Sequence, residues 1–104
     1  MTLTNTRKKY LRTLGHRLNP VVTVAGKGLT DAVVAEIDRA LTDHELIKVR
    51  LTVGDRDLKK SLIDEICTRL AADEVQVIGH ILLLFRAAKK PDPKLSNLLR
   101  EPGL

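Results

Sequence analysis

The stretch Ala25-Gly26-Lys27-Gly28 places a lysine between two glycines, directly after an apolar run and before a predicted helix. Glycines at such a junction let the backbone approach a ligand closely, and free N–H groups at the start of the helix point the same way. With the charge of Lys27, this combination suits the phosphate of a phosphodiester. A structural strand-to-helix turn explains the same residues, and Asp31 at the start of the helix disfavours an incoming anion.

Few other residues are candidates for metal binding, catalysis or nucleotide binding. His16, His44 and His80 fall on separate predicted elements, so a shared metal site is not expected. The single cysteine, Cys67, lies among apolar residues of a predicted helix, where cysteine acts as a small hydrophobe. The glycine-rich stretch lacks the spacing of nucleoside-triphosphate and dinucleotide loops. We therefore expect a protein that is not an enzyme and has no cofactor, no metal and no small-molecule substrate.

Basic residues are concentrated at the two ends of the chain. Residues 1–20 hold five basic and no acidic side chains, and residues 86–104 hold five basic and two acidic ones, whereas residues 21–85 hold eight basic and eleven acidic ones. Basic ends around a near-neutral centre suggest a local patch for a polyanion, although a solvated helix face explains the first run equally well. The lone cysteine fits a reducing compartment, and no apolar stretch approaches the ~20 residues of a membrane span. We therefore expect a cytoplasmic protein that does not cross a membrane.

The apolar pattern predicts an α/β chain with seven elements and no internal repeat. Their order is a helix capped by Thr4, a strand over 21–24, a helix from Thr30 to about residue 44, a strand over 47–53, a helix capped by Asp55, and two strands joined at Gly79-His80. The apolar stripes expected to face the core are Tyr10, Leu11, Leu14 and Leu18 in the first helix and Leu58, Leu62, Ile66 and Leu70 in the third.

This α-β-α-β-α-β-β order restricts the topology to a four-stranded mixed sheet. Strands joined through helices become parallel by right-handed crossovers, and the closing hairpin adds an antiparallel pair. The two crossover helices should pack on one face and leave the other, with Lys48 and Arg50, less covered. We expect a single compact domain over residues 1–87, followed by a basic, proline-containing tail over 88–104 that is extended or mobile.

The run LNPVVTVAGKGLTDAVVAEIDRALTDHELIKVRL, followed by EVQVIGHILLLFR, closely resembles the YhbY group of CRM domains (chloroplast RNA splicing and ribosome maturation) over about residues 3–87. The strings GLT, HELIKV and VQVIG carry the resemblance. It implies an RNA-binding domain similar in fold to the C-terminal domain of a bacterial translation initiation factor, with a GxxG loop after the first strand. Bacterial stand-alone members are linked with precursors of the large ribosomal subunit. Ala25 stands at the first glycine position of that loop, so we expect either strain at Ala25 or a turn at Gly26.

The resemblance and the charge pattern together define a candidate RNA surface. It comprises Gly26, Lys27 and Gly28 in the loop, Arg7, Lys8, Lys9 and Arg12 in the first helix, and Lys48 and Arg50 in a strand. We expect the basic helix and Lys27 to converge on one side of the molecule. The predicted function is that of a monomer contacting phosphates and backbone of ribosomal RNA during large-subunit assembly. The alternative is a protein-interaction module whose basic ends bind an acidic ribosomal or assembly protein.

Overall fold

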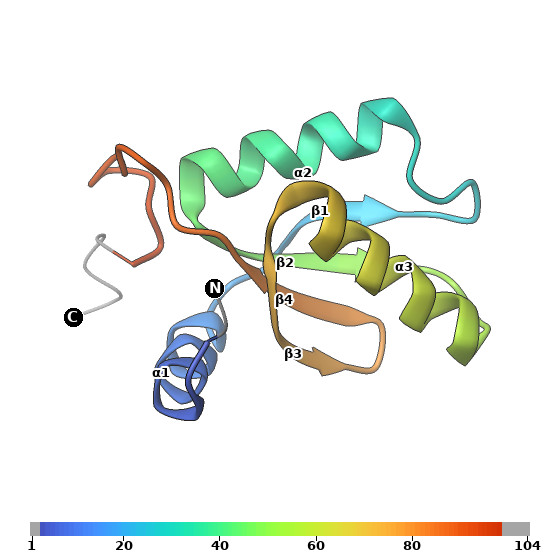
Figure 1. Ribbon diagram of the computed structural model, residues 1–104, viewed down its shortest axis with the longest axis horizontal. Coiled ribbons are helices and arrows are strands. Elements are labelled where there is room, and N and C mark those ends of the chain that lie inside the picture. The colour runs from blue at the N-terminus through green and yellow to red at the C-terminus, as the bar shows by residue number, and fades with distance from the viewer. Residues whose placement is uncertain (1–2, 99–104) are drawn as a thin grey trace.

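The protein is built on a four-stranded mixed sheet with helices on both faces (Figure 1). The structure is a computed structural model and describes residues 3–98. The elements are α1 (Asn5–Gly15), β1 (Pro20–Val24), α2 (Asp31–His44), β2 (Leu46–Leu51), α3 (Arg56–Leu70), β3 (Asp73–Ile78) and β4 (Ile81–Phe85). The sheet order is β1-β2-β4-β3, with β1 and β2 parallel and the other neighbours antiparallel. The predicted fold class and element order are confirmed.

The helix starts follow the capping residues predicted from the sequence. Thr4 and Thr30 each accept a hydrogen bond from the backbone N–H three residues later, at 3.1 and 3.2 Å, and Asp55 Oδ1 accepts two, at 2.8 and 3.1 Å. Each such cap stabilises its helix by about 1 kcal/mol. Gly79, the first residue of the β3–β4 link, has φ +57, which suits a two-residue hairpin with glycine leading.

The two faces of the sheet are covered by different helices. The larger core packs the side chains of α2 and α3 against one face, with Ile37, Leu41 and Ile66 fully buried. A smaller core lies on the opposite face, where Leu11 of α1 packs against Leu46, Leu83 and neighbouring residues. Figure 1 shows α1 set apart from α2 and α3. Among residues 3–98, no helix has the length and apolar character needed to cross a bilayer.

Two residues predicted to belong to the buried stripes are exposed. Leu58 is 56% exposed, since it lies in the first turn of α3, which projects beyond the ends of the strands (Figure 1). Tyr10 is 47% exposed, and the Arg7 guanidinium carbon lies 5.4 Å from the centre of its ring and 5.8 Å from that of Phe85. Tyr10 therefore takes part in a cation–π contact at the edge of the smaller core.

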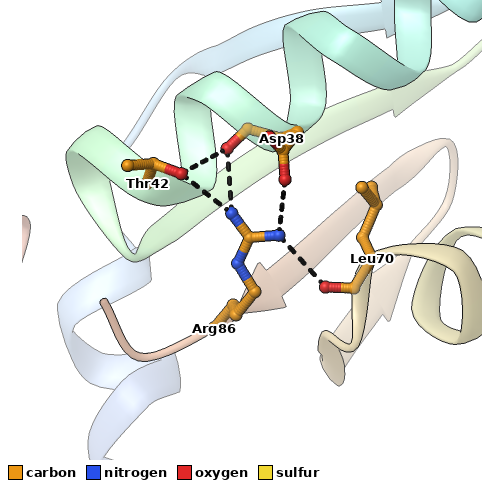
Figure 2. Close-up of polar contacts among 4 residues, drawn as sticks. All are labelled: Asp38, Thr42, Leu70 and Arg86. Atoms are coloured by element: carbon orange, nitrogen blue, oxygen red, sulfur yellow. Dashed lines mark hydrogen bonds and ion pairs between the residues drawn. The ribbon is translucent and has the colours of Figure 1, made fainter. Parts of the chain in front are cut away.

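Arg86, the residue directly after β4, forms hydrogen bonds with residues of α2 and α3 and so links these three elements (Figure 2). Its Nη1 donates to Asp38 Oδ1 at 2.8 Å and to the Leu70 carbonyl at 3.1 Å. Its Nη2 donates to the Asp38 carbonyl at 2.9 Å and to Thr42 Oγ1 at 3.0 Å. Because the planar guanidinium presents several donors at once, one side chain fixes the second half of α2 to the end of α3.

The tail returns to the domain, so the expectation of an extended or mobile segment is wrong for residues 92–98. Glu45, which ends α2, is buried and has φ 63, a conformation that costs a non-glycine residue about 1–3 kcal/mol. Its carboxylate accepts hydrogen bonds from the Ser96 hydroxyl at 2.6 Å and the Ala88 N–H at 2.8 Å. The Asn97 N–H donates to the His44 carbonyl at 2.9 Å. The same expectation for residues 99–104 lies outside the described residues.

We predict that Arg86→Ala lowers the free energy of unfolding by about 2–3 kcal/mol, because it removes four charge-assisted hydrogen bonds of a half-buried side chain. Urea unfolding followed by circular dichroism measures this value. The matched control is Arg39→Ala on α2, whose side chain is 86% exposed and pairs with Asp43 at 3.9 Å, and we expect it to cost under about 0.5 kcal/mol. Equal losses in the two variants would contradict the role given to Arg86.

Ser96→Ala should cost about 1–3 kcal/mol, because it leaves a buried carboxylate oxygen of Glu45 without its hydroxyl donor. It should also raise the amide hydrogen-exchange rate of Asn97, whose N–H bond depends on the docked tail. Ser61→Ala on the exposed side of α3 is the control and should change neither quantity. If the Asn97 amide hydrogen exchanges as fast in the parent protein as in Ser96→Ala, the tail is not docked.

Candidate nucleic-acid interface

The glycine-rich loop forms a single tight turn after β1. The Gly28 N–H donates to the Ala25 carbonyl at 2.9 Å, and Gly28 has φ +75. Ala25 has no positive φ, so the strain expected there does not arise, and the residue that needs glycine is Gly28. A Cβ added at Gly26 or Gly28 would meet no atom within 4 Å, so the loop faces open space. Lys27, between them, is exposed, and no carboxylate of residues 3–98 forms an ion pair with it.

The basic residues of α1 divide into two sets. Arg7 is engaged with the rings of Tyr10 and Phe85, and Lys8 is half-buried. Lys9 and Arg12 instead line a hollow beside the sheet, together with Thr13, His16, Arg17, Gln76 and Ile78. Lys9, Arg12 and Thr13 of α1, and His16, which caps its C-terminus, recur at the spacing of one helix side. This side of α1 faces β3, with which the helix is in contact.

Lys48 and Arg50 lie on the sheet face that α2 and α3 do not cover, as the strand alternation predicted. Lys48 pairs with Leu83 of β4, whose side chain belongs to the smaller core, and Arg50 pairs with Ile81. Lys48 lines a second hollow with Gly15 and His16, which places it next to the end of α1. The strand residue Lys48 and the helix residues Lys9 and Arg12 therefore border one surface.

The loop and α1 do not converge on one site, contrary to the prediction. α1 packs on Leu46 and Phe85, where β2 begins and β4 ends, whereas the loop follows Val24, which pairs with Leu51 at the end of β2. A strand of this length spans ~17–20 Å. Figure 1 shows the loop and α1 at opposite ends of the sheet. The reason is connectivity, because α1 precedes β1 while the loop follows it.

Sequence reasoning missed His16, Gln76 and Ile78, which border both hollows. His16 could have been found from its helical spacing to Lys9 and Arg12. Gln76 and Ile78 alternate with Val77, whose side chain packs on the larger core, but the pattern does not say which face of the sheet each set occupies. Only the pairing of Gln76 with Leu83 and of Ile78 with Ile81 assigns both to the open face.

Neither metal binding nor nucleophilic catalysis is supported by the described residues. Within residues 3–98, no group of three or more His, Cys, Asp or Glu side chains lies close enough to hold a metal ion. Burial, reinforced by the carboxylates of Glu74, Asp73 and Asp64, raises the pKa of the Cys67 thiol to about 11. A thiol with so high a pKa is protonated at neutral pH, and the thiolate is the reactive form.

We expect Cys67 of the folded protein to react slowly with iodoacetamide at neutral pH, with a rate that rises as the pH passes through about 11. The same chain in denaturant should react faster at neutral pH, because its thiol titrates near the ordinary value of ~8.5. Mass spectrometry of quenched samples measures both rates. Rapid labelling of the folded protein at pH 7 would show that the thiol is activated.

Comparisons with known proteins identify the family of the chain. Residues 3–86 match the CRS1 / YhbY (CRM) domain. Over 104 residues, all of both chains, the protein is 47% identical to a Pseudomonas aeruginosa protein named "Probable RNA-binding protein". It is 47% identical over 89 residues to an "RNA-binding protein" of Haemophilus influenzae, covering 86% of this chain and 90% of that one. The solution structure of a hypothetical protein of Staphylococcus aureus, described as a candidate RNA-binding protein, aligns with a TM-score of 0.76 and 32% identity over 86% of this chain and 93% of that one. The chain belongs to the CRS1 / YhbY (CRM) domain family.

Proposed function

We propose that this protein is a non-enzymatic RNA-binding protein that contacts the phosphates and backbone of ribosomal RNA in precursors of the large subunit. The observation that carries the proposal is the surface bordered by Lys9, Arg12 and Lys48. Within the described part of the chain, no Asp or Glu lines either of the two hollows there, although the sequence has thirteen acidic residues. The names of the relatives support RNA as the partner. The assignment to large-subunit precursors, and to a cytoplasmic monomer, comes from the resemblance and the composition.

Electrostatics supplies the binding energy in this proposal. Each lysine or arginine that neutralises a phosphate releases condensed counterions, which favours the complex and makes it salt-dependent. The first turn of α1 carries Arg7 and Lys8 and no acidic residue, so its cations oppose the helix dipole. That arrangement costs a few tenths of a kcal/mol per charge in the free protein. A bound polyanion would relieve this cost.

The loop Gly26-Lys27-Gly28 serves as a second contact at the far end of β2. Its open backbone allows a phosphate to approach, and Lys27 supplies the charge. Arg50 is exposed and lies along β2 between Lys48 and the loop, so it extends the basic surface in that direction. An RNA that contacts the α1 surface, Arg50 and the loop has to follow β2 over its length. The loop and α1 therefore contact different phosphates of that RNA.

We predict that Lys9→Ala with Arg12→Ala, Lys48→Ala, and Lys27→Ala each weaken binding to large-subunit RNA and flatten its salt dependence. The slope should fall by roughly 0.7–0.9 for every phosphate that the variant no longer neutralises. Fluorescence anisotropy over a series of salt concentrations measures both the affinity and the slope. Arg39→Ala and Lys60→Ala, on the helices that cover the opposite face, are the charge-matched controls for the single variants, and the two combined are the control for the double variant.

Unchanged slopes in the three test variants would refute the proposed surface. Treatment of purified precursor particles with nuclease separates this function from the protein-interaction alternative. Release of the protein as exposed RNA is digested supports RNA binding, whereas retention on the digested particle supports binding to an acidic protein.

A further inference from the structure

The sheet face beside the end of α1 is hollowed, and its floor is apolar. A hollow of about 200 Å³ lies between α1 and the sheet and is lined by Gly15, His16, Lys48, Gln76, Ile78, Ile81 and Leu83. Ile78 is 65% exposed, which is unusual for a large aliphatic side chain in a strand. Gly15 makes the close approach of α1 possible, since a Cβ there would lie 2.7 Å from the Leu83 methyl carbons.

The polar side chains of His16, Lys48 and Gln76 also line this hollow. The half-buried Gln76 amide and the exposed His16 ring have no hydrogen-bond partner among the described side chains and backbone. The neighbouring hollow shares His16, Gln76 and Ile78 and adds Lys9 and Arg12. An apolar floor with a few convergent polar groups is the usual composition of a ligand site. Here the site opens directly onto the cations assigned to RNA phosphates.

We propose that the hollow takes one unpaired nucleobase of the bound RNA, with the adjoining phosphates held by Lys9, Arg12 and Lys48. The inference rests on the proposed RNA-binding function and adds to it the class of nucleotide that this face selects. The base lies on Ile78, Ile81 and Leu83, while the Gln76 amide and the His16 ring hydrogen-bond to its edge. A phosphate alone does not fit this floor, because apolar side chains cannot replace the water that it would lose.

Size and charge both favour a base as the occupant. A dry cavity of about 150 Å³ is known to accept a benzene ring, so this larger hollow has room for a flat heterocycle. An apolar side chain of a protein partner would also fit the floor, but its binding would not use the surrounding cations. Bases of an A-form duplex are stacked and paired, so the hollow selects a bulge, a loop or a single strand over a duplex.

The test uses a charge-neutral substitution at the exposed floor residue. Ile78→Ser should bind a short single-stranded RNA containing all four bases about five- to tenfold more weakly than the parent protein does, with the same salt slope. Its affinity for a blunt RNA duplex should not change. Leu58→Ser on α3 replaces a leucine of similar exposure away from the hollow and should leave both affinities unchanged. Because Ile78 and Leu58 are both exposed, we expect both variants to fold, and circular dichroism checks this.

An abasic strand gives the second measurement. The parent protein should lose affinity when ribose without a base replaces the central nucleotides, whereas Ile78→Ser should hardly distinguish the two strands. Methyl signals of Ile78 and Ile81 should shift in NMR spectra when the intact strand is added. Equal binding of intact and abasic strands by the parent, with unmoved methyl signals, would overturn the base site while leaving phosphate binding in place. Failure to bind any strand, the duplex or large-subunit RNA would overturn the proposed function as well.

Discussion

The partial cover of one sheet face by α1 is the constraint on which the rest of the structure depends. The helix α2 connects the parallel strands β1 and β2, and it packs with α3 on one face of the sheet. Among the described helices, α1 alone covers the other face. Its 11 residues span only about 16 Å at 1.5 Å per residue. α1 shields the buried side chains of Leu46, Leu83 and Phe85 and leaves Arg50 and Ile78 uncovered. The hollow that contains Gly15 and Leu83 lies where the helix ends, and the hollow with Lys9 and Arg12 lies along the side of the helix.

Several of the thirteen acidic residues have structural roles away from the hollows beside α1. Asp38 accepts from Arg86, Asp43 pairs with Arg39, and Glu65 pairs with Arg69, all on α2 and α3. Asp55 caps α3, and the buried Glu45 holds the tail through Ser96. These carboxylates thus support the fold, and within residues 3–98 none of them forms an ion pair with a cation of α1 or β2. Among the described residues, the two hollows beside α1 are therefore lined by basic but not by acidic side chains, which net charge alone does not reveal.

The scarcity of aromatic residues shapes the kind of recognition open to this protein. Tyr10 and Phe85 both lie beside Arg7 at the edge of the smaller core. Phe85 is buried and the exposed Tyr10 ring contacts the Arg7 guanidinium, so the two do not form the row of exposed rings on which many RNA-binding sheets stack bases. The basic side chains of Lys48 and Arg50 along β2 and the aliphatic floor at Ile78 are the features that remain for the proposed RNA contact. Both depend on the same uncovered face, so backbone binding and base selection would act on one RNA segment.

The sequence by itself determined the element order, the capping residues Thr4, Thr30 and Asp55, and the two-residue hairpin at Gly79, because these depend on local backbone chemistry and side-chain periodicity. It also determined that Lys48 and Arg50 share a face, since alternation in a strand is local. Only the tertiary structure decided which sheet face α1 covers, where Gln76 and Ile78 point, and that the tail docks on Glu45. It also separated Lys27 from α1 by the length of β2. These features arise from contacts between residues distant in the chain, which no local pattern records.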